Sequence, residues 1–263
     1  MWGRVLMRYR IWLATCVFLA GTLPCWAGSS CKVGIVFDRA PRPVHDFSKL
    51  LSKAEAGESD AQFQVGLAYA SGIGTIQDVA EAVRWYRKAA DHGNPAAQNN
   101  LGSMYLRGLG VEQSDHDAIR WFTRAAVEGF PAAQNNLGLM YARGRGVPQN
   151  DTTAVAWYRK AMVRHYAPAE SNLGFMYLQG RGVPANTKEA AKLFRKAART
   201  GDATAQYNLG LLYYLGSGVK QDSGVAAKLF RAAAAGGSRE AQSGIGSSFR
   251  SVADAALVAA PID

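Results

Sequence analysis

The stretch that decides the fold reads Ala-Gln-Asn-Asn-Leu-Gly-Leu-Met-Tyr-Ala-Arg-Gly-Arg-Gly-Val-Pro at residues 133–148, and Ala-Trp-Tyr-Arg-Lys-Ala follows at residues 156–161. Its pattern returns every 36 residues along the chain. One glycine position recurs in six successive units, at Gly66, Gly102, Gly138, Gly174, Gly210 and Gly246. An alanine five residues before each glycine and an aromatic residue three residues after it keep the same spacing. A fixed period of this length is typical of a repeat protein whose units stack on their neighbours.

Each unit contains two segments with the periodicity of an amphipathic α-helix. The apolar positions follow the spacing i, i+4, i+7 and i+8, first at Ala61, Val65, Ala68 and Tyr69, then at Ala82, Tyr86, Ala89 and Ala90. Glycine pairs such as Gly144 and Gly146 separate the two segments and permit a turn with positive φ. The position that should cap the second segment holds Asp78, Ser114, Asn150, Asn186 or Asp222. We therefore predict an all-α protein, a right-handed α-solenoid of 36-residue helix-turn-helix repeats.

Units of this form resemble Sel-1-like repeats, relatives of the tetratricopeptide repeat with a longer loop between the helices. Five whole helix pairs fill residues 59–238. A solenoid needs capping ends. We predict an N-terminal capping half-repeat at residues 44–58 and a C-terminal capping helix with a tail at residues 239–263. The resemblance implies adaptor, assembly or signal-regulating roles, carried out by binding other proteins.

The first 27 residues have the layout of a secretory signal peptide. Arg4, Arg8 and Arg10 form a positively charged start, residues 11–20 are apolar, and Cys25-Trp26-Ala27 offers a cleavage site. The apolar run is too short for a comfortable membrane span. We predict cleavage near Ala27 and a periplasmic or secreted protein, followed by an extended linker at residues 28–43. An uncleaved leader that anchors the protein in the envelope is the alternative.

Charge and cysteine content narrow the remaining choices. The chain has a net charge of +10, and loss of the three leader arginines lowers it to +7. The basic residues are spread through the repeats, which disfavours nucleic acid as the partner. Cys16 and Cys25 belong to the leader, so the mature chain keeps only Cys31 and forms no internal disulfide.

No arrangement of residues indicates an enzyme. The four histidines are scattered over different units, and Cys/His spacing suited to a metal or a phosphate-binding loop is absent. We predict no catalytic residue, no metal site and no cofactor. Ser217-Gly218-Val219-Lys220 fits the Ser-x-x-Lys motif of serine β-lactamases, but the companion motifs are missing. A β-lactamase-like or cell-wall hydrolase of the cysteine-rich Sel-1-like type is therefore the alternative function.

A protein or peptide partner is expected along the first helices, which line the concave side of tetratricopeptide-like stacks. The predicted groove residues come from three rows of first-helix positions: Asn100, Asn136, Asn172, Asn208, Ser103, Phe175, Arg107 and Arg143. Carboxamides can donate and accept hydrogen bonds, which suits a peptide backbone. The same amides could instead bond neighbouring helices, and that use is the alternative interpretation of the row.

Overall fold

The computed structural model describes residues 46–242, and the predicted signal peptide, linker and C-terminal tail lie outside this range. All regular elements within it are α-helices: α2 (Phe47–Glu55), α3 (Ser59–Ser71), α4 (Val79–Asp91), α5 (Pro95–Arg107), α6 (Asp115–Val127), α7 (Pro131–Arg143), α8 (Asp151–Met162), α9 (Ala167–Gln179), α10 (Thr187–Ala198), α11 (Ala203–Leu215), α12 (Ser223–Ala235) and α13 (Arg239–Gln242). The pairs α3–α4, α5–α6, α7–α8, α9–α10 and α11–α12 are called units 1 to 5.

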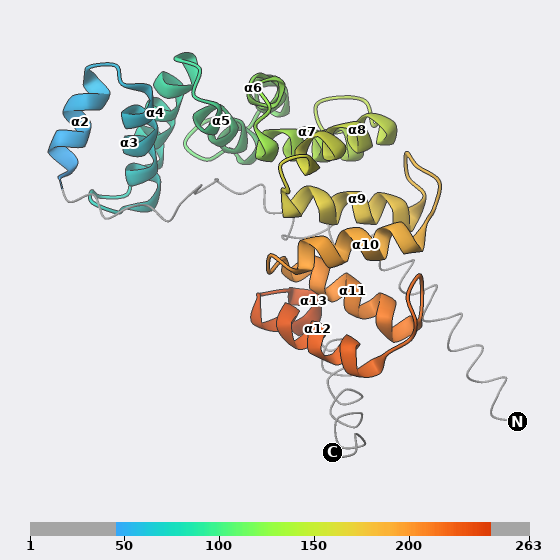
Figure 1. The fold of residues 1–263 in the computed structure, drawn as a ribbon. Helices are drawn as coiled ribbons and strands as arrows, with labels where there is room; N and C mark the ends of the chain where they lie inside the picture. The colour runs from blue at the N-terminus through green and yellow to red at the C-terminus, as the bar shows by residue number, and fades with distance from the viewer. Residues whose placement is uncertain (1–45, 243–263) are drawn as a thin grey trace, which may run out of the picture.

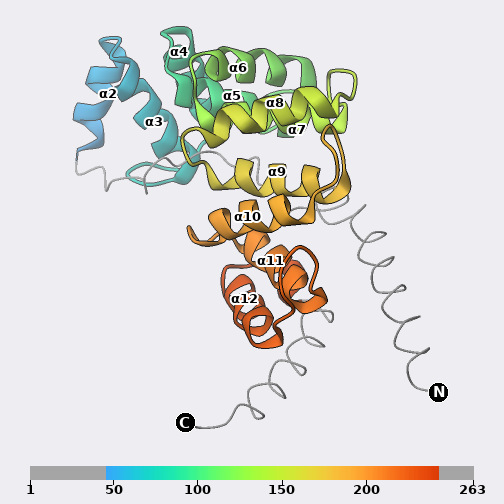
Figure 2. The ribbon, with the colours of Figure 1, turned by 45° about the vertical axis from the view of Figure 1, so that its right-hand side comes forward.

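Each helix packs against the next one along the chain, as expected for a solenoid. Figures 1 and 2 show a single curved stack, and in Figure 1 the run of helices from α2 to α8 turns at α9 and continues to α13. The predicted all-α solenoid is confirmed. None of the helices in residues 46–242 is both long enough and apolar enough to cross a membrane.

Local sequence explains where the helices begin and end. The second helix of each unit starts at the predicted cap, where Asp78, Ser114, Asn150, Asn186 or Asp222 accepts a hydrogen bond from a backbone N–H of the first turn. The first helix ends at a glycine in the left-handed region, as at Gly144, where φ is 65°. Such a residue satisfies a free carbonyl at the helix end, and glycine adopts the conformation without steric cost.

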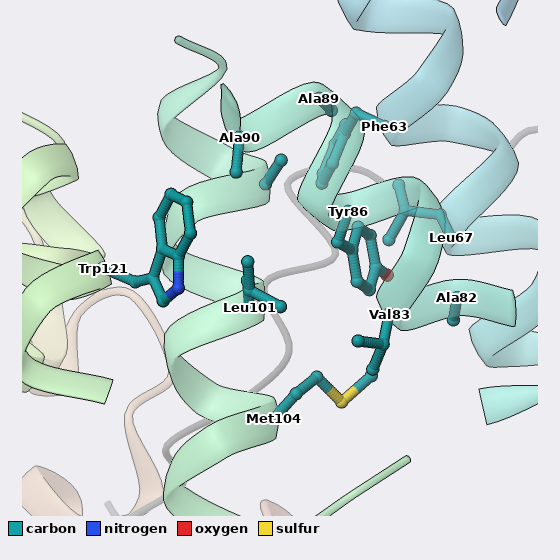
Figure 3. Close-up of a cluster of buried hydrophobic side chains, with 11 residues drawn as sticks. Phe63, Leu67, Ala82, Val83, Tyr86, Ala89, Ala90, Leu101, Met104 and Trp121 are labelled. Carbon is teal, nitrogen blue, oxygen red and sulfur yellow. The ribbon is translucent and has the colours of Figure 1, made fainter. Parts of the chain in front are cut away.

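The recurring mid-helix glycine allows the two helices of a unit to approach closely. A Cβ at Gly138 would lie 2.5 Å from Cε1 of Tyr158, whose side chain is buried. Figure 3 shows the corresponding core of unit 1, where the ring of Tyr86 lies beside Leu67 and Val83. Leu101 from the next unit belongs to the same cluster, so the core continues from one unit to the next.

First and second helices are buried to different extents. Nine of 13 residues are buried in α5 and ten of 13 in α7, against five of 13 in α6 and four of 12 in α8. A helix with so little free surface has neighbours on most sides. The difference is large in units 2 and 3 and amounts to one residue in units 1, 4 and 5. We call the first helices the inner row of the stack and the second helices its outer row.

Candidate functional site

Four of the eight predicted groove residues are buried in the inner row. The fractional exposure is 0% for Asn100 and Ser103, 4% for Asn136 and 8% for Asn208. Their side chains lie inside the stack and not on an open surface. The prediction that they line an open groove is corrected accordingly.

The buried amides bond neighbouring helices or their own backbone. Asn136 donates through Nδ2 to Oδ1 of Asn99 at 2.9 Å, and Asn172 donates in the same way to Asn135 at 2.8 Å. Each of these bonds joins the first helices of adjacent units. Asn208 instead donates to the carbonyl oxygen of Thr204, within its own helix. The contacts thus agree with the alternative interpretation of the row, in which the amides hold the stack together.

The other four predicted residues have atoms at the surface. Arg107 is exposed, and Arg143, Asn172 and Phe175 are half-buried. Leu211 and Leu215 of unit 5 are also half-buried and occupy the positions equivalent to Phe175 and Gln179. We call the six residues Arg107, Arg143, Asn172, Phe175, Leu211 and Leu215 the inner-row surface. It is basic in units 2 and 3 and apolar in units 4 and 5.

Arginine residues in two loops fix the positions of neighbouring units. Arg145 Nη2 lies 2.5 Å from Oδ1 of Asp115 in unit 2, and its Nε donates to Oδ2 at 3.1 Å. Arg181 makes the equivalent pair with Asp151 of unit 3, and its Nη2 also donates to the carbonyl oxygen of Ala142 at 2.7 Å. These bidentate links hold one edge of the second-to-third and third-to-fourth junctions. No pattern in the sequence predicted these two links.

Burial raises the pKa of three tyrosines among the described residues: Tyr86, which is fully buried, and Tyr166 and Tyr207, which are half-buried. Burial raises the pKa of Tyr86, and a hydrogen bond with Asn100 opposes the shift. Burial, with a smaller contribution from Asp202, raises the pKa of Tyr166. Burial, reinforced by the charge of Glu240, raises the pKa of Tyr207 to about 12. All three phenols are therefore protonated at neutral pH and serve as packing groups.

The Ser-x-x-Lys match lies in the loop between α11 and α12. The backbone N–H of Ser217 donates to the carbonyl oxygen of Leu212, and helix α12 begins only at Ser223. The motif is thus part of the inter-helix turn found in the other units. Across residues 46–242 there is no group of three or more His, Cys, Asp or Glu side chains that could hold a metal ion.

Comparison with known families agrees with this architecture. The Sel1 repeat matches residues 59–94, 95–129, 131–161, 167–202 and 203–238. The chain belongs to the Sel1 repeat family. Proteins of this family act generally as scaffolds for protein–protein interaction. No curated protein sequence matches the chain.

Two solved structures show the family relationship at the level of coordinates. A protective antigen of uropathogenic Escherichia coli with an SLR fold has 35% identity and a TM-score of 0.66; the match covers 72% of this chain and 41% of that one. A Sel1 repeat protein from Oxalobacter formigenes has 32% identity and a TM-score of 0.66, over 73% of this chain and 85% of that one. The chain thus spans less than half the length of the first of these two relatives.

Proposed function

We propose that this Sel1 repeat protein is a non-enzymatic, exported scaffold that binds a protein or peptide along its inner-row surface. The observation that carries the proposal is the contrast between an invariant buried frame and a surface that changes from unit to unit. The frame residues fill the core in every unit, whereas the position of Arg107 becomes Arg143, Gln179 and Leu215 in the following units. Variation on a repeated frame gives each unit its own contact.

The chemistry of the surface indicates the partner. Arg107 is exposed and Arg143 lies one unit further along the same row, so an acidic segment would be attracted there. Phe175, Leu211 and Leu215 would receive apolar side chains, because partly exposed aromatic and aliphatic groups gain free energy when they lose contact with water. The partner that fits both the basic and the apolar part of the inner-row surface is an acidic segment followed by apolar residues, running from unit 2 towards unit 5.

The first experiment identifies and then maps the partner. In-cell crosslinking with pull-down and mass spectrometry would supply a binder, which is then titrated against purified variants. Arg107→Glu with Arg143→Glu should weaken binding at least about tenfold, because close charge pairs at interfaces contribute on the order of 1.5 kcal/mol or more. The parent affinity should also fall as salt rises.

A matched control separates the site from general charge effects. Arg120→Glu with Lys192→Glu makes the same change of charge on the exposed face of the outer helices α6 and α10. Binding should stay close to that of the parent in this variant. If both double variants fold and both bind as tightly as the parent, the arginines do not belong to the site.

Export and the absence of catalysis are tested separately. Intact-mass analysis of the periplasmic fraction should show a protein that has lost residues 1–27, as the leader sequence predicts. A full-length species confined to the cytosol would contradict export. Turnover of nitrocefin by the purified protein, abolished by Ser217→Ala, would contradict the assignment as a scaffold and support the hydrolase alternative.

A further inference from the structure

The short turns between units follow one rule at five of the six described positions. The residue at the turn is a glycine with positive φ, at Gly57, Gly93, Gly129, Gly201 and Gly237, with φ between 84° and 94°. At the equivalent place between units 3 and 4 stands His165, the only non-glycine residue with positive φ among residues 46–242, at 55°. A side chain with a Cβ is strained in this region, and glycine is not.

A second contact is also missing at this turn. At the five other turns, a backbone N–H just before the next first helix donates to a carbonyl five residues earlier, as Phe130 does to Ala125 at 3.0 Å. This bond closes the C-terminal end of a helix. At the turn between units 3 and 4, His165 keeps the bond to the carbonyl three residues earlier that the turn glycines also make, here to Met162 at 2.9 Å. A bond from Tyr166 to Ala161 is absent from the described backbone contacts.

The third difference concerns a side chain that joins the units at the other junctions. Glutamine Nε2 donates to a carbonyl at the end of the preceding helix at five junctions, from Gln62, Gln98, Gln134, Gln206 and Gln242, at distances of 2.8 to 3.3 Å. Unit 4 has Glu170 in this position, and an ionised carboxylate has no hydrogen to donate. Glu170 is 2% exposed and pairs with Lys196 of its own unit at 3.0 Å.

Other contacts still hold the opposite edge of the same junction. Arg181 of unit 4 binds Asp151 at the start of α8 and the carbonyl of Ala142 at the end of α7. The three missing features lie at the other end, where α8 finishes and α9 begins. The junction is therefore fixed along its loop edge and weakened along its turn edge, at the place where the stack turns in the view of Figure 1.

We propose that the junction between α8 and α9 is a hinge, in which units 4 and 5 rotate against units 1 to 3 about the Arg181–Asp151 link. The hinge is independent of the proposed function, but its motion would change the spacing between the two ends of the inner-row surface. Arg143 lies on one side of the hinge and Phe175 on the other.

Spin labels at equivalent outer-helix positions test the motion with a built-in control. Arg84, Ala156 and Lys228 are exposed, and neighbouring members of the set are two units apart. One double-cysteine variant, Arg84→Cys with Ala156→Cys, stays on one side of the hinge, whereas Ala156→Cys with Lys228→Cys spans it. Cys16, Cys25 and Cys31 are replaced by serine in both full-length chains. The distance distribution across the hinge should be the broader one.

Two further variants test the cause. His165→Gly with Glu170→Gln introduces the glycine and the glutamine found at the other turns. This variant should narrow the Ala156–Lys228 distance distribution to the width of the control pair. Gly129→His with Gln134→Glu places the same histidine and glutamate at the junction between units 2 and 3. This variant should broaden the Arg84–Ala156 distance distribution. Equal widths for the two pairs in the parent, or a width that the restoring variant leaves unchanged, would overturn the hinge.

Hydrogen exchange on the same chains distinguishes a hinge from local fraying. Backbone amides at the end of α8 and the start of α9 should exchange at least about tenfold faster than their equivalents in α6 and α7. The restoring variant should remove this difference. Fast exchange together with equal distance widths would mean local fraying only, and the hinge would then be rejected.

Discussion

The inner helices of units 2 and 3 are buried along most of their length, whereas those of units 4 and 5 have fewer buried residues and more half-buried ones. The same row positions are occupied by Ser103 and Leu139, both buried, in one region and by Phe175 and Leu211, both half-buried, in the other. An amide ladder joins α5, α7 and α9 but does not continue to α11, where Asn208 bonds within its own helix. One repeated frame thus supports a more buried centre and a more accessible C-terminal half.

The largest loss of stability should come from replacing the mid-helix glycine, which contacts a buried aromatic ring in both regions. Gly138→Leu and Gly210→Leu each place a side chain against a buried ring, since a Cβ would lie 2.5 Å from Tyr158 and 2.8 Å from Phe230. Overpacking typically costs about 1–3 kcal/mol and sometimes more. Both melting temperatures should therefore fall. If Gly210→Leu kept the melting temperature of the parent while Gly138→Leu lowered it, the two regions would not share the same packing of glycine against the ring.

Gly224→Ala is the matched control for these substitutions. Its Cβ would meet only Oδ1 of Asp222 at 3.4 Å, and its φ is not positive. The melting temperature should equal or slightly exceed that of the parent.

The next effect concerns the arginine links of the central junctions. Arg181→Met removes a bidentate, largely buried contact and should lower the free energy of unfolding by about 2 kcal/mol, measured by urea denaturation. Arg84→Met breaks an ion pair whose arginine side chain is 72% exposed, and should cost no more than about 0.5 kcal/mol. Equal losses in the two variants would remove the special role of the Arg181 link.

A smaller difference is expected along the amide ladder itself. Asn136→Ala removes a donor that is itself buried and should cost about 1.5 kcal/mol. Asn172→Ala likewise leaves a buried acceptor, Asn135, but at a half-buried position that water can reach, so it should cost less than about 1 kcal/mol. Chemical denaturation of the two variants measures both losses in the free energy of unfolding. A larger loss for Asn172→Ala would contradict the view that the ladder is strongest in the centre.

The smallest effect distinguishes the C-terminal region by its response to alkali. Tyr207 has a folded-state pKa of about 12, against an ordinary value near 10, so its contribution is present below pH 10 and is lost as the pH rises towards 12. At pH 11 the loss should be roughly 1 kcal/mol. Subtracting the pH profile of Tyr207→Phe isolates this contribution. Parallel profiles between pH 9 and 11 would show that the phenol does not resist ionisation.

The repeated helix pairs could be predicted from sequence because equivalent positions hold chemically similar residues with the same structural role in every unit. The mid-helix glycine accommodates an aromatic ring, and the cap position always holds a side chain that accepts a hydrogen bond. Helices begin at Ser59, Pro95, Pro131, Ala167 and Ala203, the residues from which the five units are counted. A strict period therefore specifies helix positions along the whole array.

The exposure of the inner row could not be predicted in the same way. A repeated asparagine gives the same pattern whether its amide faces solvent or a neighbouring helix, and the choice depends on the tertiary packing around each helix. The arginine links were hidden for another reason. Arg145 and Asp115 are 30 residues apart, so aligning the units by their 36-residue period does not bring them together.

The links made by Arg145 and Arg181 determine which repeat units can be deleted or duplicated without leaving a charged side chain unpaired. Each unit that contributes such an arginine relies on an aspartate of the unit before it, so a unit is complete only within the right sequence context. Unit 3 alone carries both halves, Arg145 in its loop and Asp151 at the start of its second helix. Deleting it would bring Arg181 opposite Asp115, and duplicating it would pair the new arginine with Asp151. Unit 3 is thus an exchangeable cassette, whereas removal of unit 2 or unit 4 would leave an arginine or an aspartate without its counterpart.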